Sequence, residues 1–212
     1  MAASRKRNVI GDCLFFGLFA AACGDGKSPQ SGLSVDRRGG AVCPSLGPLQ
    51  APDVPTALRA PEGNTLTTRY YAEGTQIYTC VPGAAGTYAW GLKAPDAKLY
   101  DAGCLLAATH FAGPTWQSSR DWSSIVGAKV GESTSPDGAG SAIPWLLLKS
   151  TSTTGEGIFG GVSFVQRIGT SGGVAPTTGC DASRANREVA IPYTAVYIFY
   201  KPADRLTNLG QR

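Results

Sequence analysis

The sequence predicts an all-β domain: a β-sandwich or jelly roll of about nine strands, with a small closed β-barrel as the alternative. Three observations predict it. From Thr65 onward, short runs of β-branched and aromatic residues are separated by Gly, Pro, Asp or Ser. No window keeps an amphipathic helical period over three turns. In the run 193–200, both alternate sets of side chains are largely apolar, as in a strand buried on both faces.

The expected strands follow the runs between these breaks. They lie at 65–72, 75–81, 87–93, 97–101, 105–112, 124–132, 143–151, 158–169 and 189–201. Pro144 confines the start of its strand to an edge or a bulge. Pro202 ends the last strand, because proline cannot donate a hydrogen bond to a sheet.

Residues 1–22 have the layout of a bacterial lipoprotein signal peptide. A cluster of basic residues precedes the apolar run 13–22, and Cys23 follows three alanines. The run is too short for a transmembrane helix, which needs about 20 apolar residues. We therefore expect cleavage before Cys23 and attachment to a membrane of the bacterial cell envelope through lipid on its thiol. Secretion after cleavage at the same alanines is the alternative.

The rest of the chain divides by composition. Residues 23–61 are rich in Gly, Pro and Ser and predict a tether, residues 62–203 form the β domain, and residues 204–212 are a C-terminal tail. The formal charge of +4 falls to +2 when three cations and one acid leave with the signal peptide. This charge is too small to indicate a nucleic-acid partner.

Four cysteines remain after Cys13 leaves with the signal peptide and Cys23 becomes the anchor. Cys43, Cys80, Cys104 and Cys180 are an even set in an oxidising compartment, which favours two disulfides in one of three connectivities. We expect Cys80 to pair with Cys180 and Cys43 with Cys104, since the second pair would tie a loose leader to the domain. No cysteine or histidine cluster has metal-binding spacing, so we expect neither a metal nor a cofactor.

His110 is the first candidate for catalysis. It is the only histidine and lies in the turn-prone stretch 109–116, and imidazole is the side chain best suited to proton transfer near neutral pH. It would serve as the acid or base of a hydrolase or lyase. No Gly-x-Ser-x-Gly elbow occurs, and no two carboxylates are singled out by spacing. A structural or ligand-contact role for His110 is the other interpretation.

Aromatic residues suggest a binding module. Trp116 and Trp122 flank the polar stretch 117–121, which predicts rings at the surface that stack on a flat ligand, with carbohydrate as the first class to consider. Gln166 and Arg167 offer planar hydrogen bonding to a carboxylate. We therefore expect an extracytoplasmic binding or interaction module. The alternatives are an enzyme that uses His110 and a purely structural envelope component.

Several motifs, in the same order, resemble a family of exported bacterial and fungal proteins of unknown function. Among them are Gln76-Ile77-Tyr78-Thr79-Cys80, His110-Phe111-Ala112-Gly113-Pro114-Thr115-Trp116 and Ile143-Pro144-Trp145-Leu146-Leu147-Leu148. The resemblance spans residues 62–201. Some fungal members carry a malate dehydrogenase label, but this chain lacks the glycine-rich turn between strand and helix that a dinucleotide site requires.

The chain departs from the family pattern at two places. Asp121-Trp122-Ser123 stands where relatives tend to have Asp-Gly-Ser, and a turn that needs a positive φ suits Trp122 poorly. Val196 stands where relatives often have Asp, so a role that rests on that acid does not carry over.

Overall fold

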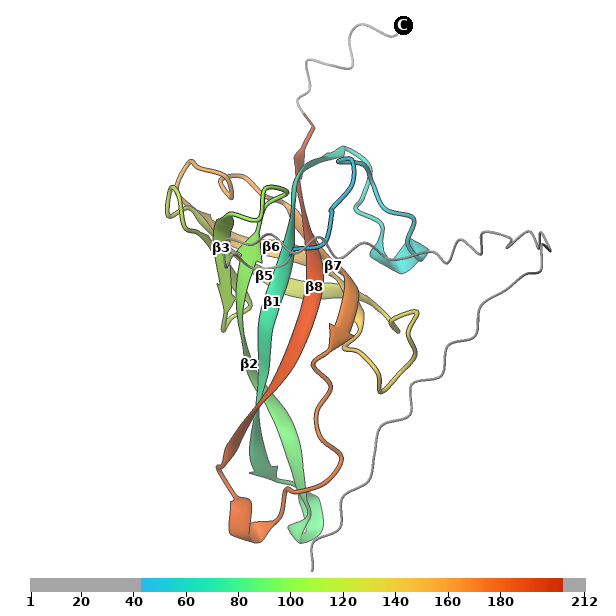
Figure 1. Ribbon diagram of the computed structural model, residues 1–212, viewed down its shortest axis with the longest axis vertical. Coiled ribbons are helices and arrows are strands. Elements are labelled where there is room, and N and C mark those ends of the chain that lie inside the picture. The colour runs from blue at the N-terminus through green and yellow to red at the C-terminus, as the bar shows by residue number, and fades with distance from the viewer. Residues whose placement is uncertain (1–42, 204–212) are drawn as a thin grey trace, which may run out of the picture. The chain divides into compact units, whose positions relative to one another are not determined.

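Eight antiparallel strands form one closed barrel in the computed structural model, which describes residues 43–203 (Figure 1). Each strand pairs with the next along the chain, and the last returns to the first. The strands are β1 (Asn64–Pro82), β2 (Tyr88–Tyr100), β3 (Leu106–Phe111), β4 (Thr115–Ser118), β5 (Ser124–Ser133), β6 (Trp145–Thr154), β7 (Phe164–Gly172) and β8 (Glu188–Pro202). Three short 3-10 helices, η1 (Thr56–Leu58), η2 (Ala84–Gly86) and η3 (Ala182–Arg184), lie in the connections. The all-β class is confirmed, in the closed-barrel form that was the second expected architecture.

Two pairs of expected strands are single long strands. The runs 65–72 and 75–81 join into β1. Gly74 lies within this strand and does not end it, because it is needed where β1 passes close to β2: a Cβ there would lie 2.2 Å from the Asp96 carbonyl oxygen. The runs 87–93 and 97–101 join into β2 across Pro95. Pro95 pairs with β1 on one side only, since β3 begins to pair with β2 at Ala97, so its missing N–H leaves no gap in the ladder.

Other boundaries also differ from expectation. The four-residue strand β4 was not expected, because polar residues surround Trp116. The expected strand 158–169 begins only at Phe164, and residues 158–163 belong to a loop. The predicted signal peptide with Cys23, and the tail 204–212, lie outside the described residues.

Aromatic residues fill one end of the barrel. Tyr70 of β1 and Phe199 of β8 pack against Phe159, which the loop before β7 inserts into the core. Asp121 fixes this loop, because its carboxylate accepts hydrogen bonds from the backbone N–H of Ile158 and from Ser123. These hydrogen bonds lower the Asp121 pKa to about 2. That end of the barrel is therefore closed.

The turn at Asp121 has the positive φ that the family pattern suggested. Trp122 adopts φ +62°, the left-handed conformation, and its ring is 72% exposed. This conformation lets the neighbouring Asp121 and Ser123 side chains both turn toward the loop before β7.

The end of the predicted tether packs on the outside of the barrel. Val54, just before η1, and Leu58, the last residue of η1, are buried against Leu147 of β6 in a second apolar cluster. Gly131 of β5 permits this contact, since a Cβ there would lie 2.1 Å from the Ala57 carbonyl oxygen. The last residues of the predicted tether 23–61, around Val54 and Leu58, therefore pack as part of the folded domain. No helix among residues 43–203 combines the length and apolar character that crossing a bilayer requires.

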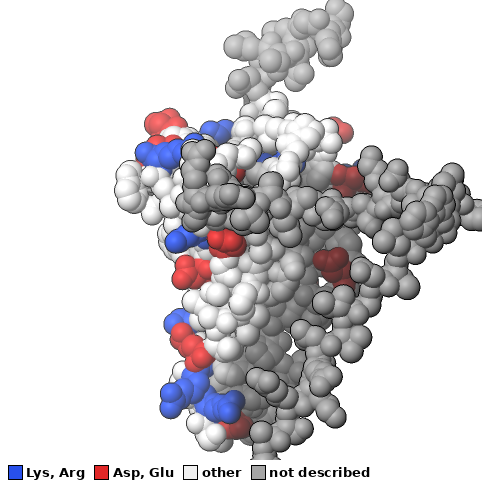
Figure 2. Space-filling view, viewed as in Figure 1, with Lys and Arg blue, Asp and Glu red and all other residues white. Residues whose placement is uncertain are grey.

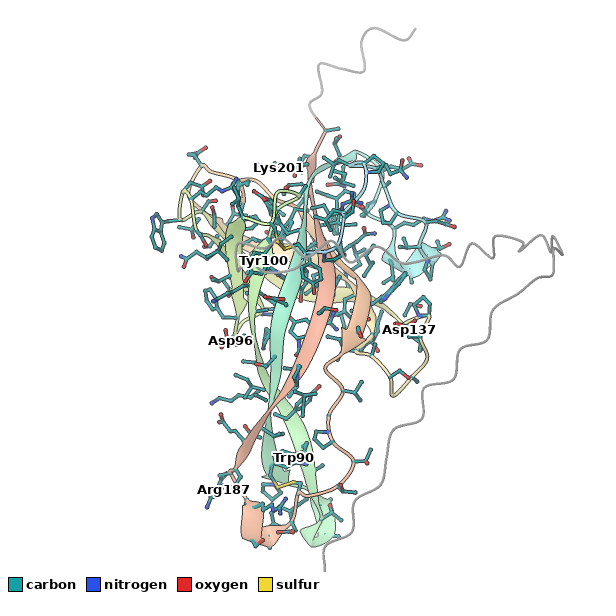
Figure 3. All side chains as sticks on the ribbon, in the orientation of Figure 1. Trp90, Asp96, Tyr100, Asp137, Arg187 and Lys201 are labelled. Carbon is teal, nitrogen blue, oxygen red and sulfur yellow. A yellow bond between two sulfur atoms is a disulfide. The ribbon has the colours of Figure 1, made fainter. Side chains whose placement is uncertain are left out.

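Strands β1, β2 and β8 continue past the barrel as a three-stranded extension. β3 pairs with β2 only from Ala97 onward, and β7 pairs with β8 only from Tyr193 onward, so the remaining parts pair only with one another. Trp90 lies near the far end of this extension, where its Nε1 donates to the Thr178 carbonyl oxygen at 2.9 Å (Figure 3).

Both disulfides have the expected pairing. Cys80–Cys180 joins β1 to the segment before η3, and Cys43–Cys104 joins the segment before η1 to the β2–β3 connection. They link residues 100 and 61 positions apart in the sequence.

We predict that the double variant Cys80→Ser with Cys180→Ser unfolds at a lower urea concentration than the wild type. Releasing a loop of this length increases the entropy of the unfolded chain and costs about 4 kcal/mol of stability. Urea unfolding followed by circular dichroism measures the change, with the reduced wild type as a second reference. An unchanged unfolding free energy would show that the extension gains nothing from this link.

Candidate functional site

A cavity of about 470 Å³ opens at the end of the barrel from which the extension leaves. Every strand contributes to its wall, with Gln76, Tyr78, Leu92, Lys93, Ala94, Pro95, His110, Trp116, Lys129, Glu132, Leu146, Leu148, Arg167 and Tyr197; Gly113, Pro114, Ile143 and Pro144 complete it. We call this cavity the mouth pocket. Its volume falls within the range of small-molecule sites, and the mouths of β-barrels are common places for them.

Three aromatic rings form one wall of the mouth pocket. His110 of β3 and Trp116 of β4 are direct neighbours in the antiparallel register, and their rings stack at 4.3 Å and 5°. The ring of Tyr197 meets both edge-on. Gly127 of β5 leaves room for the indole, since a Cβ there would lie 3.3 Å from Cζ3 of Trp116. The sequence prediction that Trp116 lies at the surface is therefore wrong: the side chain is 1% exposed.

His110 is a neutral imidazole with one nitrogen available to a ligand. Its Nδ1 lies 2.8 Å from the Thr115 carbonyl oxygen, and because that oxygen only accepts, Nδ1 carries the proton. Nε2 is then an acceptor, and it forms no hydrogen bond within residues 43–203. Burial lowers the His110 pKa to about 3, and the nearby Arg167 acts in the same direction. The ring carries no charge at neutral pH.

No catalytic pair surrounds His110 in the described part of the chain. Glu132 lines the same pocket, but its carboxylate binds Lys129 at 2.6 Å. No carboxylate contributes to the shift of the His110 pKa. The lining contains no Ser, Thr or Cys. Its two tyrosine hydroxyls are engaged, that of Tyr78 with the Gly173 carbonyl oxygen and that of Tyr197 with the hydroxyl of Tyr193.

Arg167 brings a positive charge into the pocket from β7. Its Nε and Nη2 donate to the Pro144 carbonyl oxygen at 3.2 and 2.9 Å, which fixes the direction of the half-buried guanidinium. Burial raises the pKa of Tyr78 and Tyr197, and the positive charge of Arg167 partly opposes this rise. The same charge adds to the effect of burial in lowering the pKa of His110. Among the described residues, Arg167 pairs with no carboxylate.

Two buried donors beside the pocket have no hydrogen-bond partner. They are Nε2 of Gln76, a residue that is 2% exposed, and Nε1 of Trp116. Gly173 packs against the stem of Gln76, since a Cβ there would lie 3.2 Å from Cγ. Ser135 Oγ and Trp145 Nε1, outside the lining, are unpaired as well. Buried donors in folded proteins are nearly always paired, so Gln76 and Trp116 add a polar requirement to the wall of the pocket but do not by themselves identify a ligand.

Sequence reasoning missed Gln76, although a signal was present. The inward positions of β1 alternate, and Gln76 falls in the same set as the buried Tyr70, Ala72 and Tyr78. A single amide in an apolar inward set marks a polar requirement inside the barrel.

The five predicted ligand-binding residues do not form one site. His110, Trp116 and Arg167 come together in the mouth pocket. Gln166 lies on the opposite face of β7, where its Nε2 donates to the Leu58 carbonyl oxygen and its Oε1 accepts from Tyr200. Trp122 lies at an exposed turn outside the pocket lining. Neighbours in sequence alternate faces in a strand, and this separates Gln166 from Arg167.

We predict that His110 makes the folded state less stable as the pH is lowered from 6.5 to about 3. In this range the unfolded chain binds a proton on His110 and the folded chain does not, so each pH unit downward removes up to about 1.4 kcal/mol. His110→Gln lacks this dependence. Urea unfolding of both proteins across the range should show the wild type losing its advantage as the pH falls. A constant difference between the two would contradict a buried, neutral imidazole.

Comparison with known proteins places the chain in a family. The model of the family described as protein of unknown function (DUF3455) matches residues 61–201, which covers the barrel and its extension. Neither the curated proteins nor the solved structures gave a match. The chain belongs to the DUF3455 family of proteins of unknown function.

Proposed function

We propose that this protein is a non-catalytic binding module of the bacterial cell envelope, anchored by lipid on Cys23, whose mouth pocket holds one small, mainly apolar molecule. The observation that carries the proposal is a cavity of about 470 Å³ with largely apolar walls. Its lining includes a guanidinium without a carboxylate partner, that of Arg167, and two residues with unpaired buried donors, Gln76 and Trp116. Such a combination of shape and few polar groups is typical of sites that bind and orient a small ligand.

The groups around His110 favour binding over catalysis. The imidazole is neutral, its Nδ1 proton is held by a backbone carbonyl, and its pocket offers no Ser, Thr or Cys nucleophile. A general base needs a pKa near the working pH, and burial moves that of His110 far below it. The enzyme alternative therefore has little support in the pocket. The purely structural alternative has little as well, since it would not need an open cavity.

The burial of Trp116 changes the kind of ligand that we expect. A sugar face stacks on an exposed ring, but one face of Trp116 is taken by His110 and the rings of Tyr197 and Phe199 lie edge-on to it. Trp122 is exposed but lies outside the pocket lining. An enclosed, mainly apolar ligand therefore fits better than a surface-bound glycan.

Two further observations support a location outside the cytoplasm and a partner other than nucleic acid. Both disulfides suit an oxidising compartment outside the cytoplasm. On the face in Figure 2, Lys and Arg side chains alternate with Asp and Glu along one edge, without a large patch of one sign. A mixed surface of this kind gives little attraction to nucleic acid.

We predict that ligands raise the melting temperature of the wild type and fail to do so when the pocket is filled. Ala94→Trp puts a large ring at the pocket wall, whereas Ala89→Trp puts the same ring at an exposed position on the same strand outside the pocket. A thermal-shift screen of envelope metabolites and monosaccharides should give hits on the wild type and on Ala89→Trp only. Hits that persist in Ala94→Trp, or no hits at all, would contradict a small-molecule function for this pocket.

We predict that cells expressing the full chain incorporate radiolabelled palmitate into it, and that Cys23→Ser abolishes the label. The thiol is the site of lipid attachment in the proposed signal, and the four other cysteines of the processed chain are in disulfides. Autoradiography of the purified protein measures the incorporation. Equal label in the variant would show that Cys23 is not the anchor.

A further inference from the structure

Resting on the proposed function, we propose that the ligand of the mouth pocket is a monocarboxylate with an apolar body, and that Arg167 binds its carboxylate. The charges of the lining, the hydrogen bonds of Arg167 and the apolar character of the remaining walls support this assignment.

The charged side chains of the lining leave a single positive charge for a ligand. Lys129 is paired with Glu132 inside the lining, and Lys93 is paired with Glu188, both at 2.6 Å. Of the three cations in the lining, only Arg167 has no carboxylate partner among the described residues. His110 adds no charge, because its ring is neutral at physiological pH.

A half-buried, unpaired guanidinium is costly, and a bound carboxylate offsets that cost. Arg167 donates to the Pro144 carbonyl oxygen and also hydrogen-bonds with the Tyr197 side chain, but these contacts engage only part of its five N–H donors. A guanidinium held in one orientation presents its remaining donors as a planar fork, which matches the two oxygens of a carboxylate. The carbonyl contact therefore positions Arg167 for binding without neutralising it.

The neutral polar groups nearby are of the kind that an anion needs. Gln76 Nε2 and Trp116 Nε1 are unpaired donors, and the hydroxyl of Tyr197 stays protonated because burial raises its pKa. No free carboxylate of the lining would repel an anion. A phosphate monoester carries close to two charges at neutral pH, so one guanidinium would leave part of that charge unpaired in a partly buried site. This favours a carboxylate over a phosphate.

The rest of the lining determines the body of the ligand. Apart from the groups above, the pocket is walled by aliphatic side chains and prolines, including Leu92, Pro95, Pro114, Ile143, Leu146 and Leu148. Burial of apolar surface against these walls supplies the affinity, and the carboxylate at Arg167 fixes the orientation. A small aromatic or aliphatic acid satisfies both requirements.

The experiment compares acids with their uncharged amides on the processed chain. Benzoate, phenylacetate and hexanoate are titrated by calorimetry beside benzamide, phenylacetamide and hexanamide, with phenyl phosphate as the dianionic probe. Arg167→Gln removes the charge. Arg69→Gln is the matched control, because Arg69 also donates to backbone carbonyls, those of Gly47 and Pro48, but lies outside the mouth pocket. Circular dichroism and melting temperature check that both variants fold.

We expect at least one acid to bind at least tenfold more tightly than its amide, and Arg167→Gln to weaken acid binding ten- to a hundredfold while Arg69→Gln leaves it unchanged. Amide binding as strong as acid binding, or phenyl phosphate binding more tightly than every acid, would overturn the carboxylate assignment while leaving a small-molecule pocket in place. The assignment is equally overturned when the thermal-shift screen yields only neutral hits. If neither the probes nor the screen give a ligand, the proposed function fails together with the inference.

Discussion

The pairing of β1 with β8 closes the sheet into a barrel and sets which side chains face its interior. After a register shift between Leu66 and Thr68, the two strands pair in one register from Thr68 opposite Phe199 to Thr79 opposite Glu188. Because side chains alternate faces along a strand, this register places Gln76 and Tyr197 on the inner face together with Arg167. A slip of one residue would turn each of them outward and would expose the core.

A barrel of eight strands has an interior that side chains only just fill or that holds one small ligand. Here the two ends differ. Phe159, inserted from the loop that Asp121 fixes, completes the packing of Tyr70 and Phe199 at one end. At the other end, the rings of His110, Trp116 and Tyr197 form one wall, and small residues such as Ala94 leave the space beside them open. The molecule thus leaves a cavity at the end where the half-buried guanidinium of Arg167 lies, which is the pattern of a site rather than of a core.

The sequence predicted the features that follow from local residue patterns and from the number of cysteines. The all-β class followed from short runs of β-branched and aromatic residues, and both disulfide pairings agree with the structure. Two members of the site, His110 and Arg167, were singled out by their chemistry. What depends on distant pairing was not predicted. The sequence predicts two strands, 87–93 and 97–101, on either side of Pro95. Nothing in the local sequence reveals that β2 pairs at Pro95 with β1 alone, so that the missing N–H does not interrupt the strand.

The errors at the candidate site have the same origin. Trp116 was expected at the surface because polar residues follow it, yet in β4 the residues that alternate with it, such as Gln117, point the other way. Gln166 and Arg167 were treated as one group, although neighbouring positions of a strand face opposite sides of a barrel wall. Only the closed sheet shows that Arg167 faces the cavity and that Gln166 binds the segment around Leu58.

The central claim is that the chain leaves Arg167 unpaired at an open mouth for a carboxylate from outside. X-ray diffraction from crystals of the protein purified from the cells that produce it, with any ligand that stays bound, measures this. The account predicts additional density in the mouth pocket, with two oxygens within hydrogen-bonding distance of the Arg167 guanidinium. A mouth filled by the protein's own side chains, with Arg167 paired to one of its own carboxylates, would contradict the account.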